Sequence, residues 1–139
     1  MKFVAIATMA TALLAAPAFA EGDAAAGEKE FKKCKSCHMI ADGDNSIVKG
    51  GKTGPNLFGL PGRTVGAEDF KYGKDLASVG ENGLAWDEAE FVAYTADPKA
   101  WLKEKLDDSG AKSKMSFKLK DAEDAANIWA YLVSVSPES

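Results

Sequence analysis

The five residues CKSCH at positions 34–38 constrain this chain more than any other feature. They contain both of its cysteines and its only histidine. Cys34, Cys37 and His38 follow one another at i, i+3 and i+4, which places all three on one face of a helix. Thiol and imidazole chemistry therefore meet at a single point, and the rest of the chain must fold around it.

Three kinds of site use such a segment. A structural zinc site needs four ligands, so a carboxylate would have to be the fourth. A redox dithiol or local disulfide usually lies beside a βαβ pattern, and no strand pattern is visible. The third is c-type haem, whose attachment signature is C-x-x-C-H. Here Cys34 and Cys37 would form thioethers with the porphyrin vinyl groups and His38 would ligate the iron. We favour haem because it gives each residue a role and also supplies a large apolar core.

The first twenty residues differ in kind from the rest. A lysine at position 2 precedes an uncharged apolar run over residues 3–16, and AFA at positions 18–20 has the small-x-small pattern of a cleavage site. This is typical of a cleaved secretory signal peptide. The run is shorter than the roughly 20 apolar residues that a bilayer span needs. We therefore expect residues 1–20 to be removed, leaving one exported, unanchored domain over residues 21–139 in the periplasm.

The remaining sequence predicts an all-α domain of short helices and long loops. The chain has 139 residues, the length of one domain, and a net charge of −4, which argues against binding nucleic acid or anionic membranes. Residues 40–66 are rich in glycine and turn residues and predict a long loop without strands. Helices are expected at residues 24–37, at residues 68–77, and after Asp87, Asp97 and Asp121.

The second axial ligand would decide what a haem here can do. Met39 adjoins His38 and cannot reach the opposite face of the ring, whereas Met115 lies 77 residues after that histidine in the polar stretch SKMSFK. A methionine is more often a core filler, but these surroundings favour Met115 as the ligand. His/Met ligation closes both faces of the iron and raises its reduction potential. The alternative is an open sixth site, as in a small peroxidase-like haem enzyme or a gas sensor.

Several stretches beyond CKSCH resemble the class I cytochromes c, most closely the bacterial cytochrome c2 branch. They occur in family order over nearly all of residues 21–139 and read GEKEFKKCKSCH, KTGPNLFGLPGR, GLAWDEAEFVAY, KMSF and NIWAYL. The resemblance implies a small cytochrome c fold wrapped around one covalently bound haem c per chain. It implies an electron carrier and no enzyme.

The resemblance also implies roles for residues around the haem. The backbone carbonyl of Pro55 should accept the Nδ1–H of His38. Arg63, Tyr72 and Trp86 should hydrogen-bond the haem propionates, and the Tyr94 hydroxyl should touch the sulfur of the axial methionine.

Lysines are expected to ring the exposed haem edge, although the protein is acidic. They flank the cysteines (Lys32, Lys33, Lys35), precede the proline loop (Lys49, Lys52) and surround Met115 (Lys112, Lys114, Lys118, Lys120). Such a ring would steer the protein onto acidic sites. We expect a monomer that docks through the face of Lys32, Lys35, Lys114 and Lys118. The resemblance implies the cytochrome bc complex as electron donor, and a photosynthetic reaction centre or a terminal oxidase as acceptor.

Overall fold

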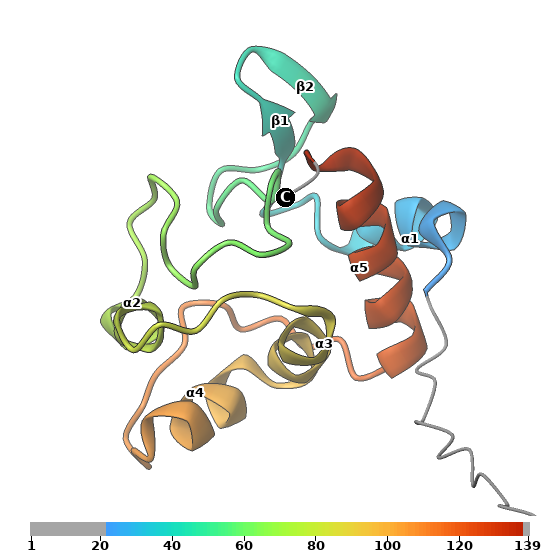
Figure 1. The fold of residues 1–139 in the computed structure, drawn as a ribbon. Coiled ribbons are helices and arrows are strands. Elements are labelled where there is room, and N and C mark those ends of the chain that lie inside the picture. Colours follow the sequence, from blue (N-terminus) through green and yellow to red (C-terminus); the bar gives the residue numbers. More distant parts are fainter. Residues whose placement is uncertain (1–21, 138–139) are drawn as a thin grey trace, which may run out of the picture.

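The computed structural model describes residues 22–137, so the expected leader lies outside the described residues. Within these residues the chain forms five α-helices, one 3₁₀ turn and a two-stranded hairpin, and α1 packs beside α5 (Figure 1). In chain order they are α1 (Ala24–Glu30), η1 (Phe31–Lys33), β1 (Ile40–Asp42), β2 (Asn45–Val48), α2 (Lys74–Glu81), α3 (Glu88–Ala96), α4 (Pro98–Leu106) and α5 (Ala122–Val135). The longest helix, α5, has 14 residues, so the expected fold of short helices and long loops is confirmed. Within residues 22–137, no helix has the length and apolar character needed to cross a membrane.

Aspartate caps begin four of these helices. Asp23, Asp87, Asp97 and Asp121 each accept hydrogen bonds from backbone N–H groups of the first turn. These bonds satisfy donors that a helix leaves unpaired at its N-terminus. The starts of α3, α4 and α5 therefore lie where the sequence predicts them.

The two terminal helices cross at close range. A Cβ atom on Gly27 would stand 1.9 Å from the carbonyl oxygen of Asn127, so only glycine allows α1 to approach α5 this closely. Phe31 and Tyr131 pack beside the crossing with ring centroids 6.0 Å apart. The backbone N–H of Asp23 donates to Oδ1 of Asn127 at 2.8 Å. This contact joins the two ends of the described chain.

The helix predicted over residues 24–37 is too long. Helix α1 ends at Glu30, a 3₁₀ turn follows, and residues 34–37 form turns. The N–H groups of Cys37 and His38 both donate to the carbonyl of Cys34, at 3.2 and 2.9 Å. The expected i+3 and i+4 spacing thus survives in a tighter turn, which the sequence does not distinguish from an α-helix.

The prediction of a strand-free loop over residues 40–66 is wrong at its start. Strands β1 and β2 form an antiparallel hairpin there with an irregular register between Ile40 and Ala41. The Asn56 side chain accepts from the Ala41 N–H at 3.0 Å and donates to the Ala41 carbonyl at 2.7 Å. The polar, turn-rich sequence of this segment does not predict a hairpin. The short first strand is supported by the Asn56 side chain, which lies 15 residues after Ala41 in the chain.

The helix predicted over residues 68–77 begins later. Helix α2 starts at Lys74, after Gly73, whose extended backbone (φ −64°, ψ 144°) ends the preceding loop. Gly73 offers no capping side chain, so the sequence carries no start signal at this point. The loop instead brings Phe70 and Tyr72 to the centre of the molecule.

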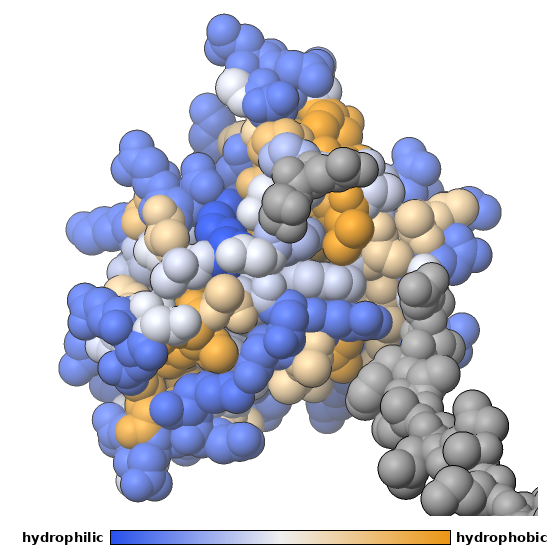
Figure 2. Space-filling view, in the orientation of Figure 1, coloured by the Kyte–Doolittle hydropathy of each residue, from blue (hydrophilic) through white to orange (hydrophobic). Residues whose placement is uncertain are grey.

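An aromatic cluster holds α3 against α4. The rings of Trp86 and Trp101 stack with centroids 5.5 Å apart and an interplanar angle of 17°. The Glu90 carboxylate accepts the Trp101 indole N–H at 2.8 Å and pairs with Lys105 at 2.6 Å. Asp87 and Glu90 therefore form only half of a capping box, since Asp87 accepts the Glu90 N–H but the Glu90 side chain turns to α4. Outside such clusters, polar side chains cover most of the face in Figure 2.

Candidate functional site

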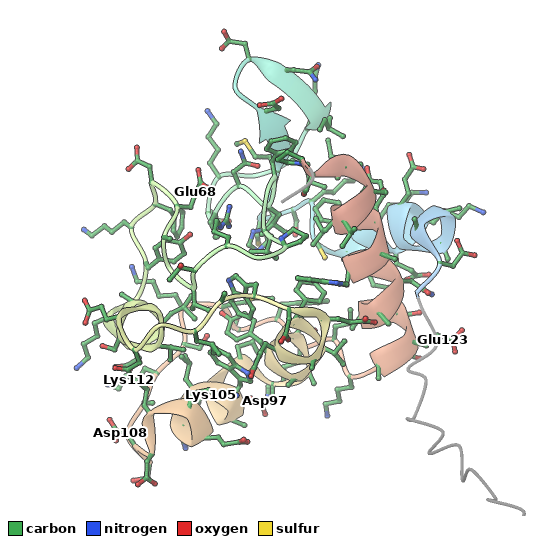
Figure 3. All side chains as sticks on the ribbon, in the orientation of Figure 1. Glu68, Asp97, Lys105, Asp108, Lys112 and Glu123 are labelled. Carbon is green, nitrogen blue, oxygen red and sulfur yellow. The ribbon has the colours of Figure 1, made fainter. Side chains whose placement is uncertain are left out.

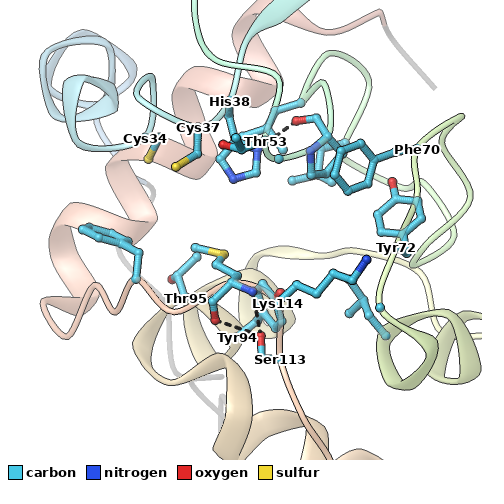
Figure 4. A pocket seen from close by; sticks show the side chains of 18 of the residues that line it. Cys34, Cys37, His38, Thr53, Phe70, Tyr72, Tyr94, Thr95, Ser113 and Lys114 are labelled. Atoms are coloured by element: carbon cyan, nitrogen blue, oxygen red, sulfur yellow. Dashed lines mark hydrogen bonds between the residues drawn. The ribbon is translucent and has the colours of Figure 1, made fainter.

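One cavity of about 360 Å³ lies between the segment that carries CKSCH and the segment that carries Met115. Figure 4 shows Cys34, Cys37, His38 and Thr53 along one wall, with Tyr94, Thr95, Ser113 and Lys114 along the opposite wall. All nine residues expected at the site line this cavity: Cys34, Cys37, His38, Pro55, Arg63, Tyr72, Trp86, Tyr94 and Met115. The structure thus brings together groups spread over 82 positions of the sequence.

His38 is held by the backbone that faces it. Its Nδ1 lies 2.8 Å from the Pro55 carbonyl oxygen, so Nδ1–H donates and Nε2 keeps a free lone pair. A Cβ on Gly54 would come within 2.4 Å of the imidazole ring, so this position needs glycine for a close approach. Burial lowers the pKa of His38, against a weaker opposing effect of the Pro55 hydrogen bond. The ring is therefore neutral at pH 7 and able to bind a metal.

The two thiols at the cavity differ in environment. Burial raises the pKa of Cys34 to about 11. Hydrogen bonds with Thr53 and then Ser36 lower the pKa of Cys37, which is exposed. Both cysteines are free in this fold, and both sulfurs stand where they could bond to one occupant of the cavity.

The segment 112–118, here called the methionine strap, forms the opposite wall. Ser113 Oγ donates to the Met115 carbonyl at 2.9 Å and accepts the Met115 N–H at 3.1 Å, which fixes a tight turn at the methionine. Burial raises the pKa of the Tyr94 hydroxyl, and interaction with the Ser113 side chain opposes this shift. The contact of Tyr94 with the Met115 sulfur stays a prediction.

Further bonds tie the strap to the rest of the fold. Asp75 at the start of α2 accepts the Lys112 N–H at 2.7 Å, and Lys118 pairs with Asp97 at 2.9 Å. Just beyond the strap, the Leu119 N–H donates to the Thr95 carbonyl at 2.7 Å. Sequence reasoning missed Asp75 and Asp97 as strap contacts, because Asp75 lies inside a predicted helix and the capping of α4 accounts for Asp97.

Arg63 is the only arginine of the chain and is largely buried, with its side chain 12% exposed. Its guanidinium donates to the Asn56 and Phe58 carbonyls and to the Glu68 carboxylate. Its Nε is the one buried side-chain nitrogen or oxygen without a hydrogen-bond partner within residues 22–137. A buried donor of this kind calls for an acceptor, and a carboxylate in the cavity would supply it.

These observations fit a haem. Two thiols and a neutral imidazole line one wall, and a thioether lies on the strap opposite. Leu57, Leu60 and Trp86 add apolar surface, and Arg63 leaves an unpaired donor. A haem c requires these features: thiols for its carbon–sulfur bonds, axial ligands for its iron, an apolar slot for its ring and a partner for its carboxylates. The cavity also excludes the zinc interpretation for Cys34 and Cys37, because the acidic side chains of residues 22–137 do not line it.

Comparison with known proteins agrees with this geometry. The family model described as cytochrome c matches residues 24–136. The chain belongs to the cytochrome c family. Cytochrome c2 of Rhodobacter capsulatus is 57% identical over 132 residues, covering 93% of each chain. Cytochrome c-551 of Roseobacter denitrificans is 56% identical over 132 residues, covering 94% of each.

Solved structures of related proteins also place the chain in the cytochrome c family. The cytochrome c2 structure from Paracoccus denitrificans superposes with a TM-score of 0.80 at 50% identity, covering 85% of this chain and 99% of that one. This cytochrome is therefore a class I c-type cytochrome close to cytochrome c2. It carries one haem c, bound covalently through Cys34 and Cys37.

Proposed function

We propose that this cytochrome carries single electrons between membrane-bound redox complexes in the periplasm, with its haem ligated by His38 and Met115. The observation that supports this best is the facing pair of walls, with a neutral imidazole on one and the methionine strap on the other. When bound, the haem supplies an iron that alternates between two oxidation states. The protein's task is to hold both ligands so that little moves when the charge changes.

Residues on each wall serve that task. The Pro55 carbonyl keeps the His38 Nδ1 proton in place, which fixes the ring orientation and directs Nε2 into the cavity. The Ser113 bonds and the tie to Asp75 hold Met115 from the other side. Burial of Leu57 and Trp86 keeps water from the slot, which lowers the cost of rearranging solvent around a changing charge.

Docking is proposed through the lysines near the cavity opening. Lys32, Lys35 and Lys114 are exposed and form no ion pair within residues 22–137. Lys118 pairs with Asp97, and Lys33 pairs with Glu30 and Asp124, so these two contribute less free charge. The proposed donor is the cytochrome bc complex and the proposed acceptor a photosynthetic reaction centre or a terminal oxidase, each presenting an acidic site.

The test is the optical spectrum of the protein purified from the periplasm, oxidised and then reduced. A weak far-red band in the ferric protein reports a methionine sulfur on the iron. Haem with this band supports the closed, six-coordinate carrier. Haem without it, together with rapid carbon monoxide binding to the reduced protein, would instead favour the haem enzyme or gas sensor.

A further inference from the structure

Glu68 and Arg63 form a partly buried ion pair at the edge of the haem cavity. Arg63 Nη1 lies 2.8 Å from Glu68 Oε2, and the two side chains are 12% and 35% exposed. Glu68 lies on the loop that precedes α2 (Figure 3), and it does not line the cavity itself, whereas Arg63 does. The guanidinium therefore stands between a carboxylate on the solvent side and the cavity.

The other contacts of Arg63 are neutral. Nη1 also donates to the Asn56 and Phe58 carbonyls, both at 3.2 Å, and Nη2 donates to the Asn56 carbonyl at 3.1 Å. These carbonyls orient the guanidinium but do not compensate its charge. Glu68 is the only carboxylate bonded to it among residues 22–137.

Among the guanidinium nitrogens, Nε alone has no hydrogen-bond partner within residues 22–137. Carboxylate bonds on one side of a guanidinium fix where its other N–H groups point, because the group is planar and rigid. Tyr72 lies beside the pair: burial raises its pKa, opposed by the charge of Arg63 and a backbone hydrogen bond with Glu68. The pair thus belongs to a packed cluster at the cavity wall.

We propose that Glu68 is a positioning residue: it holds Arg63 so that Nε–H meets a haem carboxylate, and it offsets the Arg63 charge and so lowers the reduction potential. This inference rests on the proposed haem-based function. Reduction adds an electron, so positive charge near the iron favours it and a carboxylate opposes it. Solvent screens a partly buried pair less than an exposed acid, so this effect should be larger than that of an exposed acid.

The first experiment compares Glu68→Gln with Asp69→Asn in the holoprotein. Both remove one negative charge from neighbouring positions, but Asp69 is exposed and forms no ion pair within residues 22–137. At the wild-type midpoint potential, we expect the ratio of reduced to oxidised protein to rise about threefold in Glu68→Gln, or about 30 mV for one electron. Asp69→Asn should change the ratio less than about 1.5-fold because solvent screens it. Equal shifts in the two variants would overturn the proposal.

A double-mutant cycle tests whether Glu68 acts through Arg63. In an Arg63→Gln background, adding Glu68→Gln should shift the potential less than it does in the wild type, because only the direct effect of the lost carboxylate charge on the iron remains. A shift that persists undiminished would mean that Glu68 acts directly on the iron, and the positioning role would be wrong.

A third readout does not need electron transfer. Because Arg63 is the only arginine, its Nε–H gives a single, unambiguous signal in a ¹⁵N–¹H NMR spectrum. We expect a hydrogen-exchange rate slowed by its bond in the wild type and in Asp69→Asn, and at least about tenfold faster exchange in Glu68→Gln. Unchanged exchange would overturn the positioning role even if Arg63→Gln failed to fold. Failure of the proposed function would look different, since protein without haem would show no redox titration in any variant.

Discussion

At the scale of single residues, the site depends on how few alternatives each position allows. Gly54 cannot accept a side chain because the His38 ring occupies the space. The Pro55 carbonyl takes the Nδ1 proton of that ring. One backbone segment therefore fixes the orientation and the protonation of the only histidine in the chain.

Met115 is the residue whose replacement should change the chemistry most. In Met115→Ala we expect the reduced protein to bind carbon monoxide and its reduction potential to fall, because the thioether that favours ferrous iron is gone. Optical titration with the gas and a redox titration measure both effects. Met39→Ala is the matched control, because Met39 contacts Leu57 through its backbone carbonyl. If the control bound carbon monoxide and Met115→Ala did not, the assignment of the distal ligand would be wrong.

The residues of the candidate site were largely predictable where their spacing in the sequence indicates their role. The attachment residues follow from CKSCH, because two thiols and an imidazole at fixed intervals suit one porphyrin edge. The Glu68 contact with Arg63 was not predictable. An exposed-looking acid in a polar loop carries no signal, and its partner is decided by how the loop bends at the cavity.

At the scale of elements, the methionine strap is held by its neighbours and contains no helix or strand of its own. Its bonds run to Asp75 of α2 and to Asp97, the cap of α4, and the adjoining Leu119 bonds to Thr95 of α3. Weakening any of these bonds should weaken the hold on Met115. The strap and the adjoining Leu119 therefore couple three helices to the cavity wall that carries Met115.

Replacing Asp75 tests that coupling. In Asp75→Ala the Lys112 N–H loses its acceptor, and a hydrogen bond to a charged group contributes about 1.5–3 kcal/mol. We expect imidazole to bind the ferric protein about tenfold faster, because the strap opens more often. Stopped-flow absorbance measures the rate. Asp69→Ala, on the loop before α2, should leave it unchanged, and equal rates in the two variants would exclude a holding role for Asp75.

The crossing of α1 and α5 should tolerate no added methyl group. In Gly27→Ala the new Cβ meets the Asn127 carbonyl at 1.9 Å, and overpacking of this kind costs about 1–3 kcal/mol. Denaturant unfolding of the holoprotein measures the loss. Gly110→Ala is the control, because its Cβ would approach only the flexible Asp108 side chain, at 3.2 Å. Equal stability of the two variants would contradict the tight crossing.

The starts of α3, α4 and α5 were predictable, whereas the start of α2 and the end of α1 were not. Asp87, Asp97 and Asp121 mark their helices because a capping carboxylate is a local signal. The end of α1 at Glu30 and the hairpin at residues 40–48 depend on tertiary contacts, such as the bonds from Asn56 to Ala41. The structure of such short segments is decided by these tertiary contacts, so their own sequence pattern does not predict it.

At the scale of the whole molecule, charge is uneven although the net value is −4. The lysines that flank the cysteines and Met115 in the sequence fall into two groups. Lys32, Lys35 and Lys114 lack ion pairs within residues 22–137, whereas Lys33 and Lys118 are paired with acids. Long-range steering depends on the first group, since paired charges largely cancel at a distance.

Neutralising that group should slow association with an acidic partner. With Lys32, Lys35 and Lys114 all changed to glutamine, we expect the bimolecular electron-transfer rate at low salt to fall about tenfold and its salt dependence to flatten. Flash kinetics with a membrane redox complex measure both. The control changes Lys29, Lys99 and Lys103 to glutamine for the same loss of charge. Equal slowing in both variants would point to net charge in place of a docking face.

The crossing of the terminal helices also sets an order of events during biosynthesis. Asp23 and Asn127 are bonded to each other but lie 104 residues apart in the chain. Every chain is made from its N-terminal end, so CKSCH emerges early and α5 emerges last. Until α5 arrives, α1 lacks the helix that it packs against. The first helix of the described residues is therefore completed by one of the last of those residues to be synthesised.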